Sequence, residues 1–144
     1  MPLLPRKGVL AIAAVIDVAL QSPGNPISAK KLAGRHGLPP RHFEPVLQAL
    51  VREGILKGIR GPRGGYQLAR ERRQVTANDI LRAAGTVEEL EATPAGSDLL
   101  SKVVLPALAN AEHQFGVALS HINVEDMTRR ARSLSAGGGA AAPS

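Results

Sequence analysis

The sequence has 144 residues, 44% hydrophobic and only 2% aromatic, which suits one domain of packed helices better than a β-sandwich built on aromatic pairs. It contains no cysteine, which excludes disulfides, thiolate metal sites, cysteine nucleophiles and cysteine-ligated iron–sulfur clusters. The formal net charge is +6, and residues 1–73 carry 13 Lys and Arg against 4 Asp and Glu, so this half is expected to contact phosphates.

The first predicted helix covers residues 7–21, where apolar side chains occupy most of a helical wheel, so we expect little solvent exposure. Arg6 and Lys7 precede the apolar run in the manner of a secretory signal, but Asp17 interrupts it. The run of about 13 residues is also too short to cross a bilayer, which takes about 20. We therefore expect a buried helix in a cytoplasmic protein.

Two short helices are predicted next, separated by a glycine. Ser28 can cap a helix over residues 29–36, because its hydroxyl can accept a hydrogen bond from a first-turn amide. A helix over residues 40–53 follows, with prolines in its first turns and apolar residues three and four positions apart. Its start carries Arg41 and His42. This layout is typical of a helix-turn-helix, whose second helix enters the major groove of DNA.

A hairpin with a basic tip is predicted after the third helix. Residues 55–60 and 66–69 have strand character, and the turn between them is rich in glycine. Arg60 and Arg63 lie at this turn, where glycines permit close approach to a phosphate backbone or to the minor groove. Each basic residue taken alone is better explained as a solvated surface charge. Further electrostatic support is expected from Lys30, Lys31, Arg35 and Lys57.

The second half of the chain is predicted to contain three further helical segments. Thr76 can cap a helix over residues 77–84, which is followed by an acidic loop. A long segment runs from Ser97 to about residue 121, where Pro106 either produces a kink or lies in the first turn of a shorter helix. A last helix is predicted over residues 124–134.

The long segment carries an apolar stripe with spacings of three and four residues, which suits packing against a partner helix. A monomer would expose this stripe as an apolar patch, which soluble monomers seldom tolerate. We therefore predict a homodimer held by the stripe together with the apolar first helix. The predicted interface residues are Leu100, Val104, Leu108, Ala111, Phe115 and Ala118.

Several runs in the first 85 residues occur together in one known family. The most specific is Arg60-Gly61-Pro62-Arg63-Gly64-Gly65-Tyr66-Gln67-Leu68-Ala69-Arg70, followed by Val75-Thr76-Ala77-Asn78-Asp79-Ile80-Leu81. They are preceded by Ile27-Ser28, Leu32-Ala33, Arg41-His42-Phe43-Glu44 and Gly54-Ile55-Leu56-Lys57. In these runs the sequence strongly resembles the Rrf2 family of bacterial transcription regulators, well over residues 6–85 and more loosely to about residue 127.

The resemblance implies a mainly α, winged helix-turn-helix fold, a dimer built on the long C-terminal helix, and a partly palindromic operator in double-stranded DNA. It also implies that residues 41–44 read bases and that residues 60–66 contact the minor groove and phosphates. For Tyr66 we favour packing on the domain over a DNA contact. The candidate DNA-binding residues are Ser28, Lys30, Arg41, His42, Glu44, Lys57, Arg60, Gly61, Arg63, Gly64, Gly65 and Tyr66.

The chain departs from the family in two places. Many members hold an iron–sulfur cluster with three cysteines before the long helix, whereas residues 86–96 and beyond contain none, so cluster sensing does not carry over and no cofactor is expected. Pro45 also follows Glu44 where a helix former is usual, which alters the angle of entry into the groove if the helix bends there.

His113 and His121 would lie on different faces of one helix, so no metal site is expected.

The predicted domain organisation is a DNA-binding domain (residues 1–85), an acidic loop (86–96), dimerisation helices (97–135) and a disordered tail (136–144). An enzyme is disfavoured, because nucleophile motifs, aligned carboxylate pairs and a Walker-type phosphate loop are missing from the sequence. A dimeric repressor is the leading hypothesis, and a winged helix used only for protein interaction is the alternative. Two modes of regulation are equally open. An unknown small-molecule or protein effector could act near the acidic loop, or the protein could bind DNA constitutively and be controlled only by its own abundance.

Overall fold

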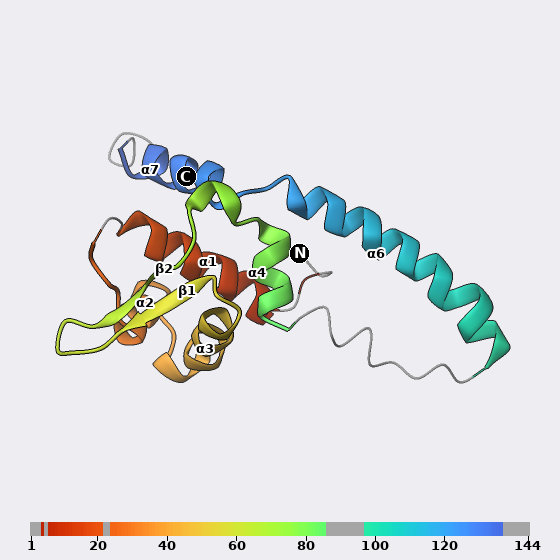
Figure 1. The fold of residues 1–144 in the computed structure, drawn as a ribbon, viewed down its shortest axis with the longest axis horizontal. Helices are drawn as coiled ribbons and strands as arrows, with labels where there is room; N and C mark the ends of the chain where they lie inside the picture. The colour runs from red at the N-terminus through yellow and green to blue at the C-terminus, as the bar shows by residue number, and fades with distance from the viewer. Residues whose placement is uncertain (1–3, 5, 22–23, 86–96, 137–144) are drawn as a thin grey trace.

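The fold is built around helix α1 (Arg6–Leu20), which lies at the centre of the head of the molecule (Figure 1). The computed structural model describes residues 4, 6–21, 24–85 and 97–136, so the acidic loop of residues 86–96 and the tail after residue 136 lie outside the described residues. One face of α1 carries small buried side chains, among them Ala11, Ala14 and Ala19, which let other helices approach closely. The expectation of little exposure is wrong at the start of α1, where Val9 is 45% exposed.

Helix α2 (Ala29–Arg35) begins as the sequence predicts, because the Ser28 side chain accepts a hydrogen bond from the Lys31 amide at 3.1 Å. The single helix predicted over residues 40–53 is wrong, since the structure contains a 3₁₀ turn η1 (Pro40–His42) followed by α3 (Glu44–Arg52). Pro45 explains the division. It has no N–H, and its ring would clash with the carbonyl four residues earlier in a continuous α-helix, so α3 begins immediately before it.

Strands β1 (Leu56–Ile59) and β2 (Gly65–Leu68) pair antiparallel and form, with residues 60–64, the wing. The wing is attached to the chain before α2 by two backbone hydrogen bonds, Ile27 N–H to Tyr66 O at 3.1 Å and Tyr66 N–H to Ile27 O at 2.9 Å. A Cβ on Gly65 would lie 2.4 Å from the Ile27 carbonyl carbon. Only glycine therefore permits this close approach.

The 3₁₀ turn η2 (Arg72–Gln74) leads into α4 (Ala77–Ala83), which begins with a complete capping box. The Thr76 hydroxyl accepts from the Asp79 amide, and the Asp79 carboxylate accepts from the Thr76 amide, each at 3.1 Å. The predicted cap at Thr76 is confirmed, and the helix ends before Gly85, whose φ of 81° is unfavourable for other residues.

An extended arm consists of the π-helical turn η3 (Leu100–Val104) and helix α6 (Leu105–Ser120), which projects away from the head (Figure 1). Pro106 lies in the first turn of α6, which is the second of the two alternatives predicted from the sequence. Because Pro106 cannot donate to the carbonyl four residues earlier, the preceding turn widens, and the Leu105 amide donates to Leu100 O, five residues back. No described helix is long and apolar enough to cross a membrane.

Helix α7 (Val124–Ala136) returns to the head and packs on α1, on the side opposite α3 (Figure 1). Two backbone hydrogen bonds of 2.8 Å fix the chain before α7 to the segment before α4: Ala77 N–H donates to Ile122 O, and Val124 N–H donates to Val75 O. Val124 and Thr128 are fully buried. The last described helix is therefore part of the head, although it follows the arm in the sequence.

Candidate nucleic-acid interface

The recognition turn, residues 41–44, joins η1 to α3. Arg41 and His42 lie in η1, and Glu44 is the first residue of α3, so the three side chains precede or open the helix instead of lying along it. All three are exposed, whereas Phe43 between them is fully buried and anchors the turn in the core. The turn therefore presents two basic groups and one carboxylate at the N-terminal end of α3, which is where a recognition helix contacts base edges.

The wing places a second set of basic residues at the surface. Arg60, Gly61 and Arg63 are exposed at its tip, and Lys57 is exposed on β1. Gly64 is required by the turn itself, because a Cβ there would lie 2.1 Å from Ile59 O. The backbone of the tip is thus held tightly while its guanidinium groups stay accessible.

Tyr66 lies at the base of the wing, on β2. Its side chain is partly buried and packs against the core of the head, and its backbone makes both hydrogen bonds to Ile27. This placement agrees with a packing role, as favoured from the sequence. A contact between Tyr66 and DNA stays a prediction.

The basic residues differ in whether they are already paired. Among the described residues, Arg41, Arg60 and Arg63 form no ion pair with an acidic group. Arg35, expected to add electrostatic support, is ion-paired within the head, because its Nη1 lies 3.3 Å from Asp17 Oδ1 on α1. Lys30 is exposed in the first turn of α2, two residues after the Ser28 cap. The arginines of the recognition turn and wing are therefore accessible cations, as are Lys30 and Lys57.

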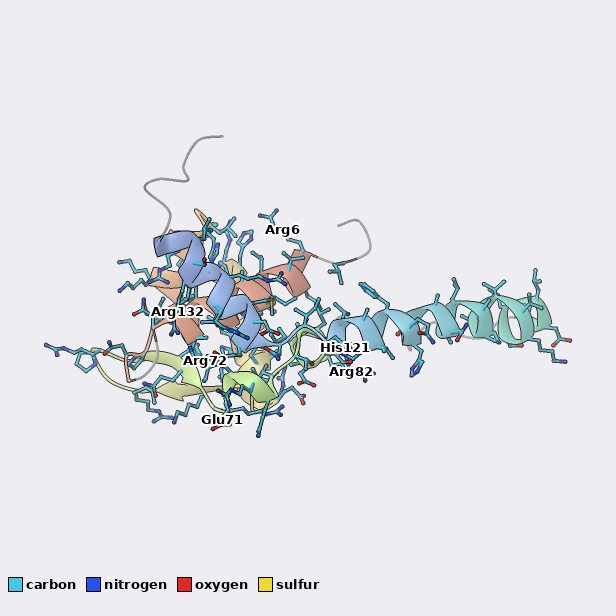
Figure 2. All side chains as sticks on the ribbon, turned by 90° about the horizontal axis from the view of Figure 1, so that it is seen from above. Arg6, Glu71, Arg72, Arg82, His121 and Arg132 are labelled. Atoms are coloured by element: carbon cyan, nitrogen blue, oxygen red, sulfur yellow. The ribbon has the colours of Figure 1, made fainter. Side chains whose placement is uncertain are left out.

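The arm carries the predicted dimer residues, and most are accessible in the single chain. Leu108 is 59% exposed, and Figure 2 shows the side chains of α6 standing out around its far half. Phe115 is an exception, because it packs against Ala77, Leu81 and Leu119 of the same chain. Leu100 is exposed, Val104 is partly buried, and Ala111 and Ala118 are exposed. Further exposed apolar residues outside the predicted stripe are Leu99, Val103 and Val117.

The described residues do not fit an iron–sulfur cluster. The chain has no cysteine, and no group of three His, Asp or Glu side chains in the described part converges as a metal site. His121 lies at the end of α6 near the head (Figure 2), whereas His113 lies two turns earlier on the arm. Thiolates are the usual ligands of such clusters, so the donor set needed is missing.

Protein purified without oxygen is accordingly expected to contain no stoichiometric iron or acid-labile sulfide and to show no visible absorption. Iron and sulfide assays together with an absorption spectrum test this directly. Reconstitution with ferrous iron and sulfide should also leave duplex affinity unchanged. Stoichiometric iron and sulfide with charge-transfer absorption would contradict the prediction.

Comparisons with known proteins agree with this architecture. The profile of the Rrf2 family, described as iron-dependent transcriptional regulators, matches residues 4–130. A Synechocystis sp. protein, slr0846, whose name places it among HTH-type transcriptional regulators, is 36% identical over 140 residues, covering 94% of each chain. The HTH-type transcriptional regulator IscR of Cronobacter sakazakii is 31% identical over 90 residues, which are 62% of this chain and 54% of that protein.

Solved structures show the same fold. The structure of T. potens IscR superposes with a TM-score of 0.70 at 29% identity and covers 89% of this chain and 87% of that one. The structure of CymR of B. subtilis superposes with a TM-score of 0.68 at 24% identity, and the match covers 88% of this chain and 96% of that one. At this identity it supports the fold alone. The chain therefore belongs to the Rrf2 family of winged helix-turn-helix transcriptional regulators, as a cysteine-free member, and is a DNA-binding regulator, not an enzyme.

Proposed function

We propose that this protein is a homodimeric repressor that binds a partly palindromic operator through the recognition turn and the wing. The observation that carries the proposal is the set of exposed arginines, Arg41, Arg60 and Arg63, which form no ion pair among the described residues. A base-reading turn followed by a basic wing is what major-groove readout with adjacent backbone contacts requires. The other candidate contacts are Ser28, Lys30, His42, Glu44, Lys57, Gly61, Gly64, Gly65 and Tyr66.

Dimerisation through the arm supports the palindromic operator. The exposed residues of the predicted stripe on η3 and α6, among them Leu100 and Leu108, form an apolar surface that one chain leaves uncovered. A second copy packed on this surface by a two-fold axis would bring two heads to one face of a duplex, at half-sites about one helical turn apart or a multiple of it. Repression follows most simply, because an operator-bound dimer can occlude a promoter without further machinery.

The proposed division of the chain follows from these roles. Residues 1–85 would bind DNA, and residues 97–135 would dimerise, although α7 within that range also packs on the head. The predicted effector site in the acidic loop, residues 86–96, lies outside the described residues. We place the protein in the cytoplasm, where its DNA target lies.

Replacing Arg63 with Ala should weaken binding to the operator and to random duplex together, because Arg63 is expected to contact phosphate and a lost phosphate contact carries no sequence information. Replacing Arg41 with Ala should cost about 1–3 kcal/mol on the operator and little on random DNA, because a base contact is lost. Fluorescence anisotropy over a series of salt concentrations measures both effects.

Arg130→Ala is the matched control, since Arg130 is an exposed arginine on α7 that, like Arg41 and Arg63, forms no ion pair among the described residues. Equal losses for Arg41→Ala on operator and random DNA would remove Arg41 from the base-reading residues. If the wild-type protein bound no duplex even at low salt, the alternative of a protein-interaction module would be favoured.

A further inference from the structure

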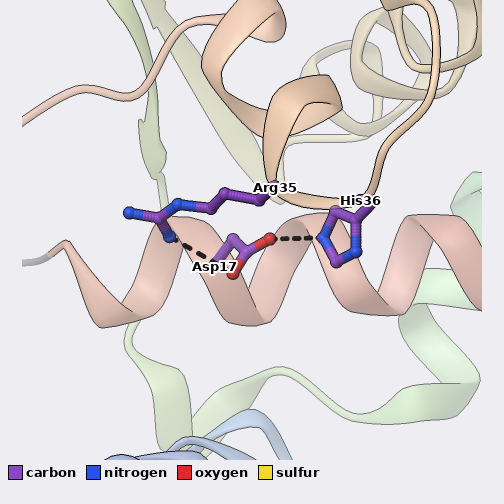
Figure 3. A network of polar contacts seen from close by, with 3 residues as sticks. All are labelled: Asp17, Arg35 and His36. Atoms are coloured by element: carbon purple, nitrogen blue, oxygen red, sulfur yellow. Dashed lines mark hydrogen bonds and ion pairs between the residues drawn. The ribbon is translucent and has the colours of Figure 1, made fainter.

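Asp17 is a charged residue in the otherwise apolar middle of α1, and its side chain is only 15% exposed. A carboxylate in such a place requires partners, because burying an unpaired charge is costly. Its partners come from the end of α2, the first helix of the helix-turn-helix (Figure 3). Arg35 Nη1 donates to Asp17 Oδ1 at 3.3 Å, and His36 Nε2 lies 2.6 Å from Asp17 Oδ2. Since a carboxylate only accepts, this histidine nitrogen carries the proton.

His36 connects this carboxylate to the recognition turn. It is the C-cap of α2, and its ring lies 5.6 Å from the ring of Phe43, centroid to centroid. Phe43 is fully buried and stands between His42 and Glu44. A continuous set of contacts therefore runs from Asp17 on α1, through His36 at the turn, to the residue that anchors the proposed base-reading side chains.

The chain between His36 and Phe43 is short and constrained, so its position depends on how these two residues are held. Gly37 has a φ of 63°, and the Leu38 amide donates to Ala33 O at 3.0 Å, which closes α2. The η1 turn then follows at once. A shift of His36 would consequently move the start of α3 relative to α1.

We propose that Asp17 is a positioning residue for DNA recognition: by holding Arg35 and His36, it fixes the orientation of the recognition turn on α1. The inference rests on the proposed function, because it assigns a role in base reading to a residue that touches no DNA. It also gives a role to the ion pair that Arg35 forms with Asp17.

The test compares Asp17→Asn with wild-type protein on operator and random duplexes, with concentrations corrected for the fraction active in binding. Electrostatics alone predicts tighter binding by Asp17→Asn, because a negative charge is removed and Arg35 is released. Positioning predicts the opposite on the operator. We expect operator affinity to fall about tenfold, while random-duplex affinity stays equal or rises, so that the operator-to-random ratio drops about tenfold or more.

Glu125→Gln is the matched control. It removes one negative charge with the same isosteric change, from a comparably exposed ion pair, Arg72 Nε to Glu125 Oε2 at 3.2 Å, on the α7 side of the head. The operator-to-random affinity ratio of Glu125→Gln should stay at the wild-type value, even if the melting temperature of this variant falls as much as that of Asp17→Asn. His36→Gln, which leaves the charge at Asp17 in place, should lower the ratio as well, and it serves if Asp17→Asn does not fold.

An unchanged ratio for folded Asp17→Asn or, where that variant does not fold, for His36→Gln would overturn the inference and leave the proposed function intact. An equal drop for Glu125→Gln would overturn it too, because a general loss of stability would then explain the effect. Failure of the wild-type protein to prefer any duplex would instead overturn the proposed function, and this inference with it.

Discussion

Leu108→Asp should convert the dimer into a folded monomer. Leu108 is 59% exposed in the single chain, so its replacement removes no core packing from the head, but a carboxylate buried between two apolar arms would be strongly unfavourable. Sedimentation should give a mass near the 15.1 kDa of one chain instead of twice that value. Operator affinity should fall by roughly a hundredfold or more, because linked heads gain about that factor over single heads.

Asn110→Asp is the control for this experiment. It introduces the same charge two residues further along α6, which lies on the opposite side of the helix. This variant should remain dimeric. A Leu108→Asp protein that sediments as a folded dimer would show that the interface lies elsewhere.

Gly65→Ala should detach the wing from the chain before α2. The new Cβ would lie 2.4 Å from the Ile27 carbonyl and 2.7 Å from the Ser28 amide nitrogen, both backbone atoms that cannot rotate away. The wing would have to separate from the chain before α2, with an expected loss of about 1–3 kcal/mol in the free energy of unfolding. Thermal denaturation measures this loss, and duplex affinity should fall because the wing arginines are no longer held in place.

Gly58→Ala provides the comparison on the neighbouring strand. A Cβ at Gly58 meets nothing within 4 Å, so this change should be neutral or slightly stabilising. If Gly65→Ala were as stable as Gly58→Ala and bound duplex equally well, the attachment of the wing at Ile27 would not matter for its function.

The sequence predicted those features of the fold that depend on neighbouring residues. The caps at Ser28 and Thr76 are confirmed, because a cap needs only a hydroxyl and an amide three residues away. The hairpin was also predictable from its glycine-rich turn. The split at Pro45 was within reach, since the sequence already showed a proline where a helix former is usual, and steric conflict with the preceding turn follows from its ring.

Features that depend on distant contacts could not be predicted. The partnership of Asp17 with Arg35 and His36 joins residues 18 and 19 positions apart, and the sequence signalled it only as one charge within an apolar helix. The spacing of Phe115 placed it in the predicted dimer stripe, but spacing could not show that Phe115 also packs against helix α4 of the same chain. For the same reason the docking of α7 on α1 became apparent only in three dimensions.

Recovery of genomic DNA fragments bound by the purified protein at near-physiological salt tests the central claim most directly. The account predicts enrichment of a short, recurring, partly palindromic sequence, and Arg41→Ala protein carried through the same selection should lose that enrichment while still retaining DNA at low salt. Fragments without a shared sequence for the wild-type protein, at low as well as near-physiological salt, would contradict it.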